Sequence, residues 1–271
     1  MITAVSGAAG YLGSAVARTL GETGRESRLD LGRLERLAPG TLDCRAVVHC
    51  AGSLRGQPAT RIWADNVTAT AALLAAVRAD TVIVFSSSRA AADPAQDLYA
   101  RSKSAAEMLT SAHPGPAWLI RLTVLAGPSP RGTGGSFLTR MAGAALRTST
   151  ITIPPHDRFV DLLDVREAAA VMSALTELPV AWPGPVAATT GPLALGALAE
   201  LTAAAVRDLT GRRVRIAQTL LSAGRRQPPA CPTGWNELRS LVRIPPVPVE
   251  STVHDTVAAL ATPTEHADDR R

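Results

Sequence analysis

The chain has 271 residues, of which 46% are hydrophobic, and a formal net charge of +5. This length suits one large α/β domain, or one domain with a small appended lobe, and the apolar fraction suffices for a buried core. No apolar run reaches the ~18 residues of a membrane span and no charged leader precedes the first strand, so we expect no membrane partner and no signal peptide. Aromatic residues make up only 3% and the arginines are scattered, which argues against a nucleic-acid partner.

Strand and helix signals alternate through the first half of the chain. The predicted strands cover 3–6, 45–50, 81–86 and 117–122, and the predicted helices cover 10–20, 62–77 and 99–111. Continuous β-branched strands between amphipathic helices indicate an α/β fold with a doubly wound parallel sheet, covered on both faces. No clear second strand is visible over 24–31, so we expect at least one βα unit to be shortened.

The second half of the chain is less regular. A loop is predicted over 128–135 and an irregular Pro-rich segment over 227–233. The predicted helices cover 137–147, 166–178, 195–209 and 251–261. The segment 160–165 leads into the helix 166–178, and 213–217 is strand-like. This pattern predicts a small C-terminal α/β lobe that ends in a frayed tail.

A glycine pattern, GAAGYLG at 7–13, follows the first strand and opens the first helix. Gly7 permits a tight turn, Gly10 lets the backbone approach a pyrophosphate at the helix N-terminus, and Gly13 lets the helix pack close to the sheet. Position and spacing favour a Rossmann-type turn over an ordinary glycine-rich one. We therefore predict a dinucleotide-binding Rossmann core over 1–127, with 128–271 contributing the substrate lobe and core segments that return at about 158–180.

The choice between nucleotides should be made about 20 residues after the turn, where a side chain contacts the adenosine ribose. Arg25 and Arg28 could bind a 2′-phosphate, which favours NADP(H). Glu26 could instead hold a 2′-hydroxyl, or all three could be solvated loop residues. We predict NADP(H), with NAD(H) as the alternative.

Lysine is used once in this chain. Lys103 is the single lysine among 28 basic residues, and it follows Tyr99 by four positions. Arginine cannot replace lysine where a compact ammonium must tune a neighbouring acid. One helical turn places positions 99 and 103 on the same face, so we predict a catalytic pair rather than a chance pattern.

The cysteines and histidines show no metal-binding spacing, and we expect no bound metal. They are Cys44, Cys50, Cys231, His49, His113, His156, His254 and His266. An odd number of cysteines favours reduced thiols in a cytoplasmic protein. His49 falls inside a predicted buried strand, where we expect a hydrogen-bonded core residue.

In their shared order, the motifs resemble the short-chain dehydrogenase/reductase superfamily, and especially its extended group of sugar-nucleotide epimerases, dehydratases and 4-ketoreductases. The resemblance covers nearly the whole chain. It rests on GAAGYLG at 7–13, HCAG at 49–52, NVTAT at 66–70, FSSS at 85–88, YARSK at 99–103, IRLTVLAGP at 120–128, RFVDLLDV at 158–165 and IPPVPVESTVHDTVAAL at 244–260.

The resemblance implies a catalytic role for three residues. Tyr99 would be the general acid/base, and the Lys103 ammonium, with the positive nicotinamide, would stabilise its phenolate. Lys103 would also bond the nicotinamide ribose. Ser88, the third serine at its strand end, would polarise the substrate carbonyl, unless it only caps the strand. Alternation puts Ser86 on the same side and Ser87 on the opposite side.

The resemblance also implies contacts to the cofactor and the substrate. Asp30 and Leu31 would lie by the adenine, Ala51 and Gly52 beside the ribose and pyrophosphate, and Thr123, Val124 and Leu125 beneath the nicotinamide. The other expected cofactor contacts are Gly7, Gly10, Tyr11, Leu12, Gly13, Cys50, Ser86, Tyr99 and Lys103. The expected substrate contacts are Ser88, Arg89, Arg131 and Arg158. Asn66 is expected to be structural rather than catalytic.

The chain departs from the extended group where the substrate would bind. Only ten residues separate Ser88 from Tyr99, and 147–158 lacks the Gly-Asp-Gly turn expected before an arginine that holds a diphosphate. Arg89 follows Ser88 where dehydratases have an acidic pair, which disfavours dehydration. Few phosphate contacts suggest an uncharged ketone of a polyketide-like secondary metabolite, with a deoxysugar 4-ketone as a close competitor.

These features predict an NAD(P)H-dependent ketoreductase in which hydride passes to the carbonyl carbon and Tyr99 delivers the proton. One alternative is an NAD-dependent sugar-nucleotide epimerase that retains its cofactor. The other is a non-catalytic dinucleotide-binding regulator, although such proteins commonly lose the tyrosine or lysine that this chain keeps. The resemblance further implies a homodimer in which helices 62–77 and 99–111 of two subunits form a four-helix bundle.

Overall fold

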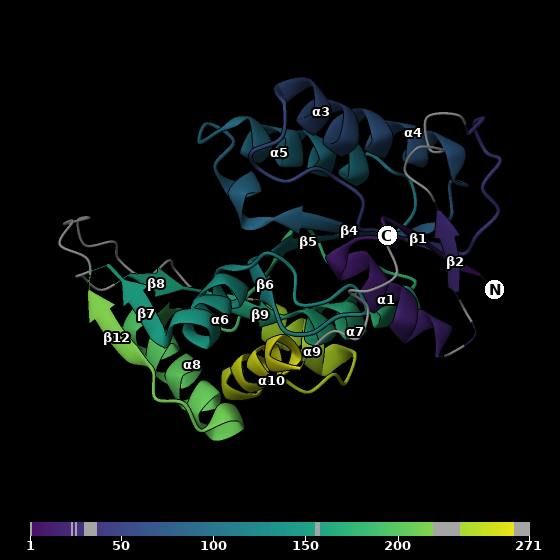
Figure 1. Cartoon of the computed structure of the whole chain (residues 1–271). Coiled ribbons are helices and arrows are strands. Elements are labelled where there is room, and N and C mark those ends of the chain that lie inside the picture. The colour runs from purple at the N-terminus through teal and green to yellow at the C-terminus, as the bar shows by residue number, and fades with distance from the viewer. Residues whose placement is uncertain are drawn as a thin grey trace, which may run out of the picture.

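Figure 1 shows the protein, a computed structural model, as a layered sheet with a smaller lobe beside it. The structure describes residues 2–22, 24, 26–29, 37–154, 158–218 and 234–262, without the side chains of 26–29. Arg25, Asp30, Leu31 and Cys231 lie outside the described residues.

The central sheet has six parallel strands in the order β10-β5-β4-β3-β1-β2. The strands are β1 (Thr3–Ser6), β2 (Glu26–Leu29), β3 (Ala46–His49), β4 (Val82–Ser88), β5 (Ala117–Leu122) and β10 (Val186–Ala188). The order 2-1-3-4-5 is one of the common doubly wound arrangements, and the chain reverses direction across the sheet between β1 and β3. The predicted α/β fold with a parallel sheet is confirmed.

Alternation along the buried strands sorts their side chains onto two faces of the sheet. Val5 and Val48 pack with α1 (Tyr11–Gly21) and α7 (Val165–Leu175) on one face. Ala4 and Val47 pack on the other face, beneath helices drawn in the upper layer of Figure 1. These helices are α3 (Ala59–Trp63), η1 (Ala64–Thr68), α4 (Ala69–Ala76) and α5 (Leu98–Ser111). The predicted helix over 62–77 is thus interrupted by the π-helical turn η1.

The prediction that no clear second strand exists was wrong. β2 is present and pairs with β1 in register, with Arg28 opposite Val5 and Leu29 opposite Ser6. The unpredicted strand β10 pairs with β5 at the opposite edge. Both are short edge strands with one neighbour each, so neither needs the continuous apolar run that marks a central strand.

The lobe has its own apolar core, drawn from segments far apart in the sequence. Its helices are α6 (Phe137–Thr148), α8 (Leu195–Thr210) and α10 (Val249–Ala261). Its short strands pair as β6 (Val124–Ala126) with β9 (Leu162–Asp164), β7 (Thr150–Ile153) with β12 (Arg215–Gln218), and β8 (Phe159–Val160) with β11 (Leu193–Ala194). The pairing of β6 with β9 places the lobe directly after β5.

The helix α9 (Trp235–Leu241) was not predicted, and it packs against the sheet with α1 and α7. Its Trp235 indole donates a hydrogen bond of 2.8 Å to buried Glu167, which also accepts one from the backbone of Val247. One carboxylate of α7 therefore holds the returning C-terminal segment. None of the helices in the described part of the chain is long and apolar enough to cross a membrane.

Candidate active site

A cavity of about 450 Å³ lies at the carboxyl ends of β1, β3, β4 and β5. This is where the strand order reverses, the place where doubly wound sheets bind ligands. The residues that line it are Gly10, Tyr11, Leu12, Gly13, Cys50, Gly52, Ser53, Leu54, Ser86, Ser87, Ser88, Tyr99, Lys103, Leu122, Thr123, Val124, Leu125, Gly135 and Ser136. Most of the expected cofactor contacts thus share one cavity with the expected catalytic residues.

The glycine turn forms a tightly closed base for this cavity. Gly7 has a φ of 72°, and a Cβ there would lie 2.7 Å from the backbone nitrogen of Ala51. A Cβ at Gly13 would lie 2.1 Å from the carbonyl oxygen of Gly7, so a side chain at position 13 would force the helix away. Gly10 is the N-cap of α1 and supplies no capping side chain. The first N–H groups of α1 therefore have no side-chain acceptor there and suit the pyrophosphate of a dinucleotide.

Tyr99 and Lys103 both belong to α5 and both line the cavity. Asp97 begins the helix by accepting a hydrogen bond of 2.7 Å from the backbone of Ala100. Ser88, at the end of β4, lines the same cavity, and its hydroxyl lowers the pKa of the Tyr99 phenol. The Lys103 ammonium donates a bond of 3.0 Å to the carbonyl of Ser86. The geometry therefore brings the predicted serine, tyrosine and lysine together.

Burial sets the electrostatics of the tyrosine and the lysine. It raises the pKa of Tyr99, while the Ser88 hydroxyl and the Arg55 guanidinium lower it. Burial also lowers the pKa of Lys103 to about 8. Lys103 therefore carries a positive charge at neutral pH. In its buried surroundings this charge favours a negative charge on a neighbouring group.

The three serines at the end of β4 point as alternation predicts. Ser87 turns away from Ser88 and donates to Glu107 at 2.5 Å, and Glu107 forms a two-point ion pair with Arg121. Ser86 donates to the carbonyl of His49 at 3.0 Å. Ser88 also accepts a hydrogen bond from the backbone of Ala90, so it caps the short helix η2 (Arg89–Ala92) as well as lining the cavity with Tyr99.

Asn66 is buried in η1 and its amide is fully engaged with protein groups. Its oxygen accepts from the backbone of Ser53 at 2.8 Å, and its nitrogen donates to Ser53 and to Ser102. A Cβ at Gly52 would lie 2.5 Å from the Asn66 oxygen and 3.5 Å from the Lys103 nitrogen. Asn66 thus shapes the wall beside Lys103, in line with the structural role expected for it.

His49 is a buried core residue with both ring nitrogens satisfied. Thr70 donates to the carbonyl of Asn66, so its oxygen accepts from His49 Nε2 at 2.9 Å. Nδ1 then accepts from the Ser6 hydroxyl at 2.5 Å. Burial lowers the pKa of His49 to about 3, so the ring stays neutral and ties β1 and β3 to α4. No group of side chains able to hold a metal ion occurs among the residues that the structure describes.

The remaining expected cofactor contacts divide into three groups. Thr123, Val124 and Leu125 line the cavity where β5 passes into β6. Cys50 lines it after the end of β3, and burial raises the pKa of its thiol to about 12. Ala51 packs beneath Gly7. Arg28 lies in β2 two residues before the level of Gly7, while Arg25, Asp30 and Leu31 are outside the described residues.

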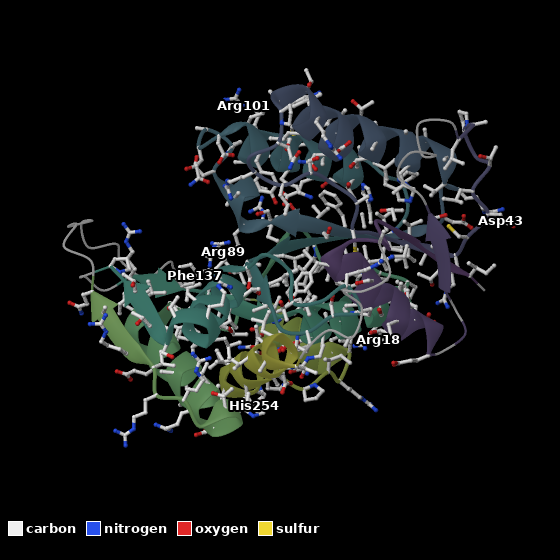
Figure 2. The ribbon with its side chains drawn as sticks, in the orientation of Figure 1. Arg18, Asp43, Arg89, Arg101, Phe137 and His254 are labelled. Carbon is white, nitrogen blue, oxygen red and sulfur yellow. The ribbon has the colours of Figure 1, made fainter. Side chains whose placement is uncertain are left out.

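The expected substrate arginines do not line the cavity. Arg89 forms an ion pair of 2.7 Å with buried Asp161, at the junction of sheet and lobe seen in Figure 2. Arg131 is exposed on its loop, and the Nε of Arg158 is buried without a hydrogen-bond partner. Of the four expected substrate contacts, Ser88 alone faces the cavity.

Sequence reasoning missed six lining residues, namely Ser53, Leu54, Ser87, Leu122, Gly135 and Ser136. Ser53 and Leu54 directly follow the carboxyl end of β3, and this position alone could have marked them as binding residues. Gly135 and Ser136 lie before α6 in the lobe, and they reach the cavity only through the tertiary fold.

The fold and the glycine turn define a Rossmann-type α/β protein with an appended lobe. The chain belongs to the NAD dependent epimerase/dehydratase family, whose profile matches residues 3–186. A comparison with curated protein sequences gave no significant match.

Several solved structures share the fold at low sequence identity. RMD from Pseudomonas aeruginosa, complexed with NADPH, has a TM-score of 0.72 at 19% identity, over 96% of this chain and 98% of that chain. UDP-glucose 4-epimerase from Brucella ovis, in complex with NAD, has a TM-score of 0.73 at 20% identity, over 94% and 97%. MoeE5 in complex with UDP-glucose and NAD has a TM-score of 0.71 at 20% identity, over 96% and 98%.

Proposed function

We propose that this protein is an NAD(P)H-dependent ketoreductase of the short-chain dehydrogenase/reductase type. The observation that carries the proposal is the meeting of Ser88, Tyr99 and Lys103 in one cavity above the glycine turn. A phenol that shares a cavity with a strand-end hydroxyl, with a buried ammonium one helical turn away, is suited to general acid catalysis at a carbonyl oxygen.

In the proposed reaction the Ser88 hydroxyl orients the carbonyl oxygen of the substrate. The Tyr99 phenol donates a proton to that oxygen as the carbonyl carbon is reduced. Lys103 stabilises the phenolate that remains, until Tyr99 is reprotonated from solvent. A nicotinamide dinucleotide, when bound, supplies the hydride.

The cofactor would be held along the glycine turn and the cavity wall. Gly10 leaves the backbone open to a pyrophosphate, and Thr123, Val124 and Leu125 line the cavity near Tyr99. The position of Arg28 near the carboxyl end of β2 supports NADP(H), since side chains there contact the adenosine ribose. NAD(H) remains the alternative, and solved structures with this fold include complexes with each nucleotide.

The proposed substrate is an uncharged ketone, of a polyketide-like metabolite or a deoxysugar. Among the described lining residues Lys103 is the one charged side chain, and it is engaged with Ser86. Leu54, Leu122, Val124 and Leu125 give the wall an apolar character. A cavity of this kind favours an apolar ligand held by a few polar groups.

An NAD-dependent sugar-nucleotide epimerase is the second candidate. It is favoured by the family and by the fold shared with UDP-glucose 4-epimerase. A regulator without catalysis is the third, and it would give the Ser88–Tyr99–Lys103 group no chemical role.

Deuteride transfer separates these functions. The protein would be mixed with NADPH or NADH carrying deuterium at C4 and with a panel of uncharged ketones. A reductase gives labelled alcohol and an equal amount of oxidised cofactor, and Tyr99→Phe should lower that rate by roughly 10² to 10⁴. Interconversion of UDP-hexose epimers without added cofactor would instead establish the epimerase. Cofactor binding without ketone reduction or epimer interconversion would support the non-catalytic regulator.

We further propose a homodimer formed through the outer layer of α3, α4 and α5. Trp63 and Met108, 40% and 67% exposed, supply large apolar side chains on these helices. Light scattering of the wild-type protein should give a mass of two chains. In Met108→Glu the measured mass should fall to that of one chain. A monomeric wild-type protein would end this proposal.

We also propose a cytoplasmic location. The two described cysteines, Cys44 and Cys50, are free thiols. A reducing compartment keeps such thiols unpaired. Fractionation of the native host would test the location directly.

A further inference from the structure

We infer that Arg55 is a positioning residue for Tyr99: its guanidinium lies over the phenol ring, holds the ring in place at the cavity and favours the phenolate. The inference rests on the proposed function, in which Tyr99 is the proton donor. Arg55 belongs to the loop that follows β3, and no sequence motif had marked it.

Three contacts fix the Arg55 guanidinium at this point. Its Cζ lies 4.8 Å from the centroid of the Tyr99 ring. Nε donates to Asp97 at 2.7 Å, and Nη2 donates to Gln96 at 3.0 Å. Asp97 is also the N-cap of α5, so Arg55 is joined to the start of the helix that carries Tyr99 and Lys103.

The loop itself is anchored on both sides of a cavity residue. Ser53 is held through its backbone by Asn66 and through its hydroxyl by Asp65, at 2.8 and 2.5 Å. Arg55 forms the second anchor, and Leu54 between them lines the cavity. Arg55 thereby sets the position of the cavity wall as well as that of the phenol.

An arginine over an aromatic face also acts on the charge of that ring, because the cation attracts the phenolate more strongly than the phenol. The charged groups near Tyr99 are Arg55 from the loop, Asp97 at the start of α5 and Lys103 one turn further along. Arg89, on η2 beside Ser88, is engaged with Asp161. Burial raises the pKa of Tyr99, Arg55 lowers it and Asp97 raises it.

The pairing of Arg55 with Asp97 differs from an ordinary surface ion pair, which would not lower the pKa of a buried phenol. Exposed Arg–Asp pairs contribute little to stability, and the Arg55 side chain is itself 52% exposed. Its partner Tyr99 is only 8% exposed, so the guanidinium covers a ring that is otherwise enclosed. Loss of Arg55 should therefore change the phenol much more than the fold.

The test is a pH titration of Tyr99 by NMR, in protein labelled with ¹³C at the tyrosine Cζ. The chain has only two tyrosines, and Tyr11→Phe identifies their signals. Arg55→Ala should raise the pKa of Tyr99 by roughly half a unit, and Arg55→Lys should restore part of the shift. The matched control is Arg78→Ala, which removes a similarly exposed arginine paired with Asp80.

The pH dependence of the rate of alcohol oxidation is a second readout. In Arg55→Ala its rising limb should shift to higher pH by the same amount as the pKa of Tyr99. An unchanged Tyr99 titration in Arg55→Ala would overturn the inference. Because the titration needs no substrate, that failure leaves the reductase proposal standing. A shifted titration in a protein that reduces no ketone would overturn the reductase proposal instead.

Discussion

The hydroxyl of Tyr11 donates a hydrogen bond of 2.5 Å to the carbonyl of Gly127, and so joins the first residue of α1 to the loop that leads into the lobe. The Tyr11 ring also lies against Gly134, where a Cβ would come within 3.1 Å of it. Gly127 and Gly134 both have positive φ angles, which suits this close approach. One side chain thus fastens the dinucleotide turn to the segment that ends at Gly135 and Ser136.

Tyr11→Phe should loosen this connection while keeping the ring in place. The lost hydrogen bond should cost about 1 kcal/mol of unfolding free energy. The apparent affinity for dinucleotide should fall several-fold, because the loop that lines the cavity is less restrained, whereas kcat should change little. Urea unfolding and cofactor titration check both effects. A large loss of kcat with unchanged affinity would contradict this account.

The sheet could be predicted where strands are buried on both faces. β3 and β4 have neighbours on each side, and their continuous apolar runs identified them. β2 and β10 lie at the two edges, and their four and three residues carry no such signal. The sequence therefore indicated the interior of the sheet and missed its edges.

The candidate site divides in a similar way. The pair Tyr99 and Lys103 could be predicted because one helical turn fixes their relation. Arg55 meets Asp97 across 42 positions of the chain, through a loop without periodicity, so only the fold reveals the contact. The expected substrate role of Arg89 likewise ignored Asp161, whose position depends on how the lobe returns to the sheet.

Gly13→Ala should damage the dinucleotide turn directly. The new methyl would lie 2.1 Å from the Gly7 carbonyl oxygen, a backbone atom that moves only with the turn. Such overpacking should cost roughly 1–3 kcal/mol and lower cofactor affinity at least about tenfold. Calorimetric titration would measure the affinity. Equal affinity in the variant would show that the turn does not bind the dinucleotide.

Gly196→Ala is the matched control for that substitution. Gly196 also lies in the first turn of a helix, α8, but beyond its chain neighbours and the backbone of its own helix no atom lies within 4 Å of its added Cβ. Replacing glycine by alanine at a compatible helical site should stabilise the protein by about 0.5 kcal/mol. Cofactor affinity should stay at the wild-type value.

Asp161→Asn should destabilise the junction of sheet and lobe. The carboxylate accepts from Arg89 at 2.7 Å, from the Thr189 hydroxyl and from the backbone of Thr190. An amide in its place turns a donor toward at least one of these donors and leaves the Arg89 charge without its partner. We expect a loss of roughly 1–3 kcal/mol in urea unfolding.

The control for Asp161→Asn is Asp80→Asn, which breaks an exposed pair with Arg78. That change should leave the urea unfolding midpoint close to that of the wild type, because exposed ion pairs contribute little. Equal effects of the two variants would mean that the Asp161 cluster contributes no more than a surface pair.

Lys103→Met should make the protein more stable at neutral pH while abolishing turnover. Burial lowers the pKa of Lys103 from its ordinary 10.5 to about 8. Between these two pH values the unfolded chain binds more protons than the folded one, so wild-type stability should rise with pH across that window. Below pH 8 the buried charge costs on the order of 3 kcal/mol, and methionine removes this cost but loses the bond to Ser86, worth about 1 kcal/mol.

The net advantage of Lys103→Met should therefore be roughly 2 kcal/mol at pH 7 and should disappear as the pH approaches 10. Urea unfolding of both proteins from pH 6 to 10 measures it. Arg101→Met, on the exposed face of the same helix in Figure 2, should show no such pH dependence relative to wild type. A difference between Lys103→Met and wild type that stayed constant over this range would mean that Lys103 is not charged in a desolvated site. Its role in stabilising the Tyr99 phenolate would then lack its physical basis, because a well-solvated ammonium acts only weakly on a neighbouring phenol.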